Sequence, residues 1–326
     1  MTVPIPGGGA DARSGVPRTD RTWLVALAAS LWGLSALFRE PLATQLPALT
    51  VVFFEHLVLV LLVSPWVLPA LKALTRASTR TKVGILVIGG GSSAIATTMF
   101  TAAFALGDPI TPQVLQKLQP VIALALAAVL LRERLRLQFA LFAVPALAGT
   151  WLVTFADPTM VTINSLHGAA LAIGAAALWA AGTVLGRLVS AELSFTHVTA
   201  LRFTGGLATL FIIVVVTGAP MTMPLRLTAW LIPLVLIPGL LALILYYFGL
   251  RATPASRATL AELAFPLTAA VVGVTLLDGS LDGSQWIGLA VLLVSVVLLA
   301  LHERRSRRPA VATPDCVEDA IQLPLP

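Results

Sequence analysis

The chain has 326 residues, of which 58% are hydrophobic and only 11% are charged. A soluble globular domain carries roughly a quarter charged residues, so this composition excludes a water-covered surface and indicates a chain solvated by lipid. The net charge of +6 would by itself suggest a nucleic-acid partner. The basic residues lie in short runs between apolar segments, however, and that distribution is typical of membrane topology. No nucleic-acid partner is therefore expected.

Two polar tails flank the apolar part of the chain. Residues 1–21 are rich in Gly, Pro, Arg and Asp, and residues 303–326 combine an Arg cluster with a Pro-rich acidic end. Both are predicted to be disordered cytoplasmic tails. Between them, ten apolar stretches approach the roughly 20 residues that cross a bilayer. They are 22–38, 50–71, 83–106, 111–131, 138–155, 165–186, 196–217, 229–250, 255–277 and 285–302. The predicted fold class is an all-α integral membrane protein with ten transmembrane helices.

The distribution of Lys and Arg predicts the orientation. The two tails and every second connection hold 17 of the 21 basic residues. The opposite connections hold only Arg39 and Arg226, beside several aspartates. Since cytoplasmic loops carry the excess of Lys and Arg, both termini are predicted to be cytoplasmic, in a multi-pass protein of the plasma (inner) membrane. An even number of helices is needed to place both tails on one side.

The second half of the chain repeats the first. Trp32 corresponds to Trp179 and Glu55 corresponds to Arg202, each pair 147 residues apart. The segment Gln116–Pro120 corresponds to Glu262–Pro266 at an offset of 146. These matches define two repeats, 22–155 and 165–302, with five predicted helices in each. Because five is odd, the two repeats must have opposite orientations in the membrane. Inverted repeats are the usual construction of secondary transporters.

The repeated segments resemble the EamA-type branch of the drug/metabolite transporter superfamily over roughly residues 22–302. The resemblance rests on Leu31-Trp32-Gly33, Gly89-Gly90-Gly91, Leu118-Gln119-Pro120 and Leu131-Arg132-Glu133-Arg134-Leu135 in the first copy, and on Leu201-Arg202-Phe203 and Glu262-Leu263-Ala264-Phe265-Pro266 in the second. The second copy departs from the pattern at Asp278-Gly279-Ser280-Leu281, where the basic cluster is lost. The resemblance implies a central cavity between the halves and export or exchange of amino acids or related small metabolites by alternating access.

Other functions remain as alternatives. Lys117 and Arg202 leave open an organic-phosphate or nucleotide-sugar type of anion exchange, as in distant members of the same superfamily. A non-transporting scaffold would not explain two inverted repeats. For an enzyme, the chain has neither a His-Glu-x-x-His helix nor a Gly-x-Ser-x-Gly elbow, and Asp278 and Asp282 each precede a turn glycine. No enzymatic activity, metal or cofactor is expected. The expected partners are a small-molecule substrate and the lipid bilayer, and the sequence is compatible with a proton as coupling ion and with a homodimer.

Five ionisable residues fall within predicted spans, where charge is costly and marks functional sites. They are Glu55, His56, Lys117, Arg202 and Glu262. Counting about 1.5 Å per residue along each helix places the first three in the outer half and the last two in the inner half. The expected pairs are Glu55 with Lys117 and Arg202 with Glu262, acting as gates or as proton-coupling acids. The alternative is interfacial snorkelling of Arg202 and Glu55, and packing of His56.

Prolines coincide with polar residues on two of the predicted helices. A proline within a helix cannot donate to the carbonyl four residues earlier, which here belongs to Gln116 and to Glu262. We expect those freed carbonyls and the side chains on the same helix faces to line the cavity. The residues of these two faces are Gln113, Gln116, Lys117 and Pro120, and Ala255, Thr259, Glu262 and Pro266. The alternative is an ordinary proline kink.

Three aromatic residues are candidates for substrate selection. Trp32 and Trp179 lie in the middle of their predicted helices, unlike interfacial tryptophans, and Tyr246 would add a hydroxyl group. They are predicted to line the cavity, with core packing as the alternative. The Gly89–Ser93 run lies within an apolar helix and predicts close helix contact and bending.

Overall fold

Each of the ten predicted segments contains helix in the residues that the structure describes. The computed structural model describes residues 21–106, 109–119, 121–122, 125–126, 138–155, 157, 163–250, 261–262 and 264–306, and in these it contains helices and turns but no strand. The first half comprises α1 (Thr22–Gly33), α2 (Ser35–Ala43), α3 (Ala48–Arg76), α4 (Thr79–Val87), η1 (Ile88–Ile95), α5 (Ala96–Phe104), α6 (Thr111–Leu115), η2 (Gln116–Leu118) and α8 (Gln138–Thr154). The second comprises α9 (Ile163–Val189), α10 (Phe195–Thr217), η3 (Leu225–Leu227), α11 (Thr228–Leu234), η4 (Val235–Leu241), α12 (Ala242–Leu250), α14 (Ala264–Leu276) and α15 (Gly283–Ser306).

Six of the helical segments in the described residues are long and apolar enough to cross a membrane: 22–43, 48–76, 79–104, 164–186, 195–217 and 225–246. Shorter apolar helices occupy 144–153, 264–276 and 283–298. The predicted total of ten spans stays a prediction. One boundary is corrected: the first segment extends to Ala43, so that Arg39 lies within a helix and not in a loop.

Two π-helices lie at matching positions of the repeat. Elements η1 and η4 begin at Ile88 and Val235, which are 147 residues apart, the offset that also relates Trp32 to Trp179. The two segments differ in sequence: η1 contains three consecutive glycines, whereas η4 contains Pro238, which removes one donor from the helical ladder, followed by the single Gly239. Single-turn π segments within helices frequently mark functional sites.

The fourth and ninth helices tighten before their prolines. The N–H of Gln119 donates to the carbonyl of Gln116, and the N–H of Phe265 donates to that of Glu262 at 3.2 Å. Both bonds span three residues, as in a 3₁₀ turn, and they are 146 residues apart. The expectation of freed carbonyls is corrected, because each accepts a hydrogen bond from the amide that directly precedes the proline. That these two helix faces line a cavity stays a prediction.

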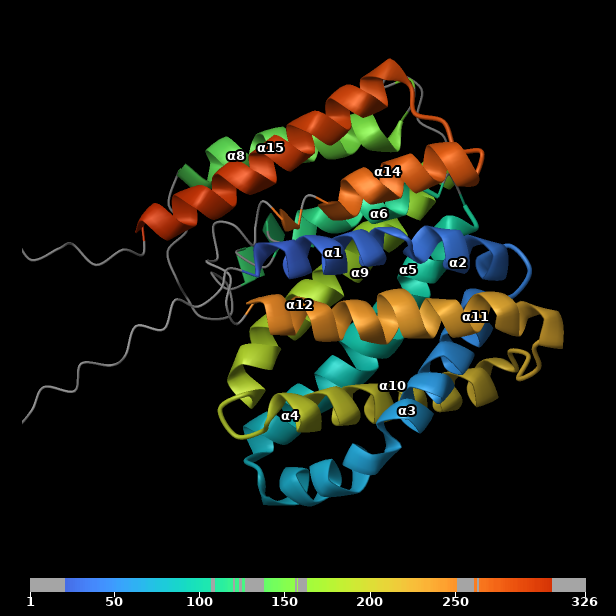
Figure 1. Cartoon of the computed structure of the whole chain (residues 1–326). Helices are drawn as coiled ribbons and strands as arrows, with labels where there is room; N and C mark the ends of the chain where they lie inside the picture. Colours follow the sequence, from blue (N-terminus) through green and yellow to red (C-terminus); the bar gives the residue numbers. More distant parts are fainter. Residues whose placement is uncertain are drawn as a thin grey trace, which may run out of the picture.

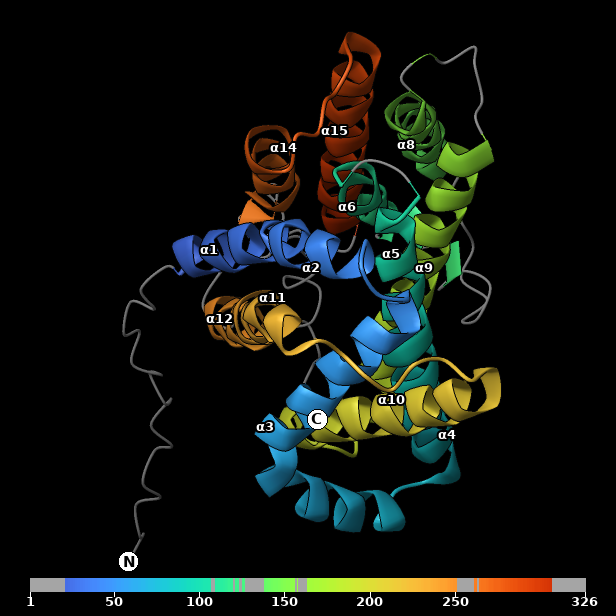
Figure 2. The ribbon, with the colours of Figure 1, turned by 90° about the vertical axis from the view of Figure 1, so that its right-hand side faces the viewer.

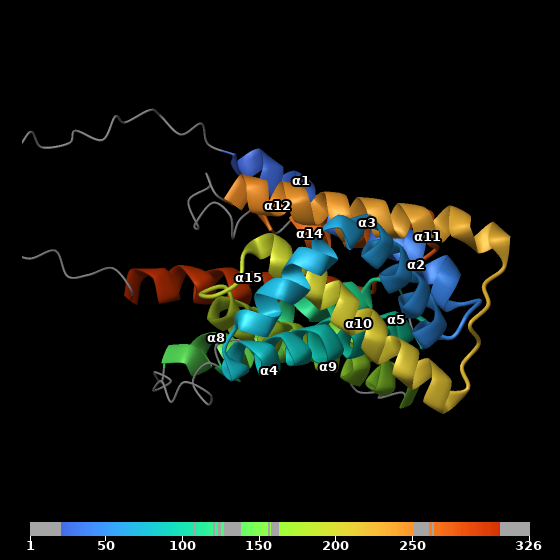
Figure 3. The ribbon, with the colours of Figure 1, turned by 90° about the horizontal axis from the view of Figure 1, so that it is seen from below.

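Many of the helices cross Figure 1 from side to side, and α1 begins and α15 ends at the same side of the array, whereas Figure 2 shows α1 and α15 inclined to each other. One flank is formed by α3, α4 and α10, and the other by α8 and α15 (Figures 1 and 2). Seen from below, α3, α4 and α10 are nearest to the viewer (Figure 3). The largest apolar core includes Leu42, Leu59 and Ile88 of the first half together with Leu201 and Leu234 of the second. The two halves therefore share this core.

The α8–α15 pair has a glycine contact that makes a stability prediction. A Cβ atom at Gly149 would lie 2.8 Å from the backbone oxygen of Gly288, whereas one at Gly186 would meet no atom within 4 Å. We expect Gly149→Ala to lower the unfolding free energy by about 1–3 kcal/mol, as overpacking does. Thermal unfolding in detergent measures this effect. Gly186→Ala is the matched control, and equal melting temperatures of the two variants would contradict the prediction.

Candidate functional site

Aromatic, acidic and basic side chains from both halves meet beside α1. The rings of Trp32 and Tyr246 lie 4.9 Å apart between centroids. The Tyr246 hydroxyl donates to Glu262 Oε1 at 2.6 Å. The Nζ of Lys117 lies 4.2 Å from the centroid of the Phe265 ring and interacts electrostatically with Glu262. This aromatic–ionic cluster (Trp32, Lys117, Tyr246, Glu262 and Phe265) presents a carboxylate, an ammonium and stacking surfaces within one region.

The tightened turns of the fourth and ninth helices place the two charges of this cluster. Lys117 belongs to the 3₁₀ turn η2, and Glu262 is the acceptor of the equivalent turn before α14. The two turns belong to different repeats, and they bring Lys117 within electrostatic reach of Glu262.

Glu55 forms a buried ion pair with Arg39. The Arg39 guanidinium donates from Nη1 and Nη2 to both carboxylate oxygens of Glu55 at 2.9 Å, and Nη1 also donates to the Thr101 hydroxyl. Arg39 and Glu55 are 5% and 6% exposed. The predicted Glu55–Lys117 pair is therefore wrong. The two-pronged geometry is the strong form of a carboxylate–guanidinium contact, and it ties α2 to α3 and α5.

Phe100 lies near both Trp179 and the Arg39 guanidinium. The Trp179 ring is 5.1 Å from that of Phe100, and the Arg39 guanidinium lies 5.9 Å from the Phe100 ring. Trp32 and Trp179, which match in the repeat, thus have different neighbours: Trp32 belongs to the aromatic–ionic cluster, and Trp179 packs against the Arg39–Glu55 pair through Phe100.

His56 and Arg202 share a hydroxyl group supplied by the π-helix. His56 Nδ1 lies 3.0 Å from the Val52 carbonyl and His56 Nε2 lies 2.9 Å from Ser93 Oγ, to which Arg202 Nε donates at 3.4 Å. The predicted Arg202–Glu262 pair is not formed, because Arg202 bonds to Ser93 of η1 and Glu262 bonds to Tyr246. The α3 residues Glu55 and His56 place this second buried network directly beside the first.

Glycines allow η1 and α10 to approach closely enough for that network. A Cβ at Gly89 would lie 3.2 Å from the Gly205 backbone, and one at Gly206 would lie 2.8 Å from the His56 ring. The predicted close helix contact at the Gly89–Ser93 run is confirmed.

The remaining predicted site residues are Gln113, Gln116, Pro120, Thr259 and Pro266. Gln113 is fully buried and accepts a hydrogen bond from Ser35 Oγ at 3.1 Å. Gln116 is half-buried, and Pro266 is buried in α14. Pro120 and Thr259 lie outside the described residues. In the part of the chain that the structure describes, no three His, Cys, Asp or Glu side chains gather as a metal site would require.

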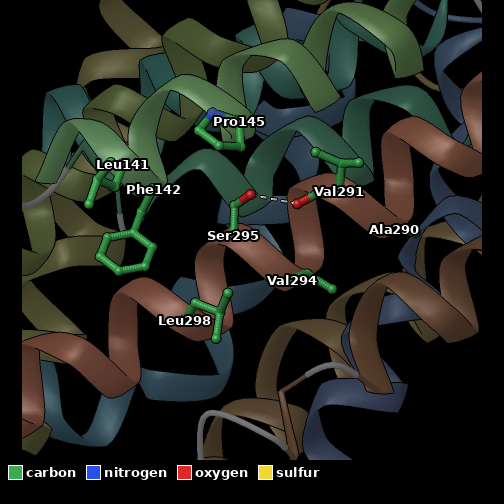
Figure 4. Close-up of a pocket in the computed structure, with 8 residues that line it drawn as sticks. All are labelled: Leu141, Phe142, Pro145, Ala290, Val291, Val294, Ser295 and Leu298. Atoms are coloured by element: carbon green, nitrogen blue, oxygen red, sulfur yellow. Dashed lines mark hydrogen bonds between the residues drawn. The ribbon is translucent and has the colours of Figure 1, made fainter. Parts of the chain in front are cut away.

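An apolar groove of about 410 Å³ lies between α8 and α15, away from these polar networks. It is lined by Leu141, Phe142, Pro145, Ala290, Val291, Val294, Ser295 and Leu298 (Figure 4). Its one hydroxyl, on Ser295, donates to the Val291 carbonyl in its own helix. Such a surface suits lipid chains, and it offers nothing to bind a polar solute.

The comparisons identify the family. The model of the EamA-like transporter family matches residues 22–155 and again 166–301. The chain belongs to this family and is therefore a multi-pass membrane transporter. It is 31% identical over 287 residues to the riboflavin transporter ImpX of Fusobacterium nucleatum, covering 84% of this chain and 95% of that protein.

Two further similarities agree with this assignment. The uncharacterized transporter YwfM of Bacillus subtilis is 31% identical over 221 residues, which cover 65% of this chain and 71% of that protein. A solved structure, titled only as the crystal structure of a protein, aligns with a TM-score of 0.58 at 19% identity, covering 89% of this chain and 100% of that one. That likeness concerns the fold alone.

The sequence interpretation missed Arg39, Thr101 and Ser93. Arg39 lies at the end of an apolar stretch and directly precedes Glu40 and Pro41, so it reads as a loop residue. Pro41 near the end of the segment is also compatible with a helix that continues past Arg39. The sequence signal for the ion pair was an arginine at the end of one apolar segment and a glutamate within the next. The role of Ser93 depends on the π-turn, which the sequence did not indicate.

The Arg39–Glu55 pair makes a prediction about stability. Removing one partner of a buried ion pair costs about 3–5 kcal/mol, because the other charge stays unpaired. We therefore expect Arg39→Met and Glu55→Gln each to lower the melting temperature in detergent more than the double variant does. Thermal unfolding of the three variants and the parent protein tests this expectation. Additive losses in the double variant would contradict it.

Proposed function

We propose that this protein is a secondary transporter that carries a small aromatic metabolite by alternating access between its two inverted halves. The observation that carries the proposal is the aromatic–ionic cluster. Its members come from the first half (Trp32, Lys117) and from the second (Tyr246, Glu262, Phe265), so a solute bound there contacts both halves at once. Alternating access requires this, because the halves move relative to each other about the bound solute.

The chemistry of the cluster favours a planar solute with hydrogen-bonding edges. Trp32, Tyr246 and Phe265 offer stacking faces, while Glu262 accepts hydrogen bonds and Lys117 donates them. The isoalloxazine ring of riboflavin combines a flat aromatic surface with carbonyl and imide groups. A relative that aligns over 95% of its length is named a riboflavin transporter. Riboflavin is therefore the first compound to test.

Amino acids are the second substrate class, as the family resemblance implies. Lys117 and Glu262 carry opposite charges in one region, which matches the carboxylate and the ammonium of a zwitterion. The aromatic rings would then select an apolar or aromatic amino-acid side chain. Organic phosphates are the third class, and they would depend on Lys117 without needing Glu262.

We further propose that both chain ends are cytoplasmic in the plasma membrane and that a carboxyl group couples transport to protons. The basic connections support the orientation. Glu262 is the candidate coupling group, because a group shared by substrate and proton links their binding. The buried networks of Glu55 and His56 with Arg39, Ser93 and Arg202 are the candidates for gating.

Uptake into proteoliposomes tests the substrate and the coupling together. Riboflavin, aromatic amino acids and organic phosphates are offered with and without a pH gradient. We expect Glu262→Gln to reduce uptake of the transported compound by at least tenfold and to remove the effect of the gradient. Unchanged uptake with an unchanged pH dependence would contradict the role of Glu262.

Substitutions in the aromatic and basic groups separate the substrate classes. Trp32→Leu is expected to weaken riboflavin binding about tenfold, since base-sized rings gain about 1–3 kcal/mol on an aromatic platform. Quenching of riboflavin fluorescence measures the binding. Trp151→Leu is the matched control, because Trp151 lies on the surface of α8 and is 46% exposed. Lys117→Ala should weaken riboflavin binding less than Trp32→Leu does, because it removes one hydrogen-bond donor and no stacking surface. A selective loss of phosphate compounds would instead favour the anion exchanger.

A further inference from the structure

Two exposed contacts join the halves at opposite ends of the molecule. At one end, Glu192, between α9 and α10, contacts Ser78 and Thr81 at the start of α4. At the other, Gln45, between α2 and α3, contacts Arg226 in η3. The connection of α9 to α10 and the start of α4 lie at the left of Figure 1, whereas the connection of α2 to α3 and the start of α11 lie at the right.

The Glu192 contact is the more extensive of the two. The Glu192 carboxylate accepts hydrogen bonds from the Ser78 backbone N–H at 2.7 Å, the Ser78 hydroxyl at 2.6 Å and the Thr81 hydroxyl at 2.8 Å. Ser78 is also the N-cap of α4, so the carboxylate lies at the positive end of that helix. The hydrogen bonds from Ser78 and then Thr81 lower the pKa of Glu192 below its ordinary value, which keeps the carboxylate ionised at neutral pH.

The Gln45 contact consists of a single hydrogen bond between the halves. Arg226 Nη1 donates to Gln45 Oε1 at 2.6 Å. Gln45 is further held within its own half, because its Nε2 donates to the Pro41 carbonyl at 2.8 Å.

The internal repeat relates these two contacts. Gln45 and Glu192 are 147 residues apart, as are Thr79 and Arg226, and Thr81 and Thr228. This is the offset that separates Trp32 from Trp179 and η1 from η4. In each contact, the connection after the first helix of one half bonds to the beginning of the third helix of the other half. The two contacts are thus the same element of the repeat, and inversion puts them at opposite ends.

We infer that the Glu192 contact and the Gln45 contact are the two gate contacts of the transport cycle, and that one opens while the other stays closed. The inference rests on the proposed alternating-access function. An inverted repeat changes state when the halves exchange conformations, so a contact between the halves at one end must have its counterpart at the other. The residues concerned, Glu192, Ser78, Thr81, Gln45 and Arg226, are not among those that hold the substrate.

The difference between the two contacts predicts which end of the transporter opens more often in the absence of substrate. Each contact includes one charged group, the Glu192 carboxylate or the Arg226 guanidinium, so the number of bonds and not their charge distinguishes the two. Near Gln45, the Thr50 hydroxyl adds a neutral bond between the halves by donating to the Pro220 carbonyl at 2.9 Å. A hydrogen bond to a charged group contributes about 1 kcal/mol more than a neutral one, so three charged bonds at the Glu192 end outweigh one charged and one neutral bond at the Gln45 end, and we expect the resting protein to open preferentially at the Gln45 end. A contact of this size biases the equilibrium without blocking exchange.

Variants that test the gate contacts follow from comparing corresponding positions of the two repeats. Glu192→Gln gives that position the residue of its repeat counterpart, and Gln45→Glu gives the other position an acid that can pair with Arg226. The first should favour opening at the Glu192 end and the second should disfavour opening at the Gln45 end, each by about fivefold in the ratio of states. Thr81→Val removes one donor to Glu192 and should act in the same direction as Glu192→Gln. The effects of Thr81→Val and Glu192→Gln should be less than additive.

Spin-label distances in nanodiscs without substrate measure the two ends separately. In a background with the single cysteine replaced (Cys316→Ser), one pair of labels is placed at Arg80 and Ala191 for the Glu192 end, and another at Thr44 and Ala229 for the Gln45 end; all four positions are exposed. Glu192→Gln should increase the long-distance population of the first pair and decrease that of the second. Asp282→Asn, which removes an exposed carboxylate elsewhere, should change neither.

The outcomes decide the inference independently of the substrate. Distances that do not change at either end, or that lengthen at both ends together, would overturn it. Opposite shifts at the two ends, with no uptake of any tested solute, would uphold the gate contacts and overturn the substrate proposal instead. Normal riboflavin uptake with unchanged distances would uphold the substrate proposal and overturn the gate contacts.

Discussion

The bilayer imposes one constraint on this chain above all others: every backbone N–H and C=O in the hydrocarbon region needs a partner within the protein, because no water is available there. The chain nevertheless carries prolines and glycine runs within its apolar segments. Some, such as Pro65 and Pro69 of α3, lie within regular α-helix, but at four places the type of helix changes and backbone hydrogen bonds are kept. The fourth and ninth helices tighten into 3₁₀ turns at Gln116 and Glu262, and the third and eighth widen into π-turns at η1 and η4.

These changes of helix type place the polar groups that the fold carries. The 3₁₀ turns bring Lys117 within electrostatic reach of Glu262, and the π-turn η1 presents Ser93 between His56 and Arg202. A regular α-helix through the same residues would point these side chains in other directions, since a change of one residue per turn rotates all that follow. The same irregular turns therefore keep the backbone hydrogen-bonded and position the polar side chains of the site.

Hydropathy, charge distribution and internal matching were enough to predict a helical membrane protein of two related halves, and the family match agrees with that interpretation. The sequence also named Trp32, Tyr246, Lys117 and Glu262, which lie together in the structure. It paired the charges wrongly, because counting residues along a straight helix estimates depth but not rotation, and because Arg39 reads as a loop residue at the end of its segment. The π-turns were not predictable, since a glycine run is also compatible with a continuous α-helix.

The two π-turns have a consequence for the history of the molecule. A segment with Gly89-Gly90-Gly91 and a segment with Pro238-Gly239 have little sequence in common, yet both widen at the same place in their repeats. Different residues thus produce the same backbone shape in the two halves. If both halves descend from one ancestral unit, that unit already possessed the widened turn, and each descendant has since found its own residues to maintain it. Duplicated halves can in this way diverge freely in side chains while the backbone irregularity is inherited.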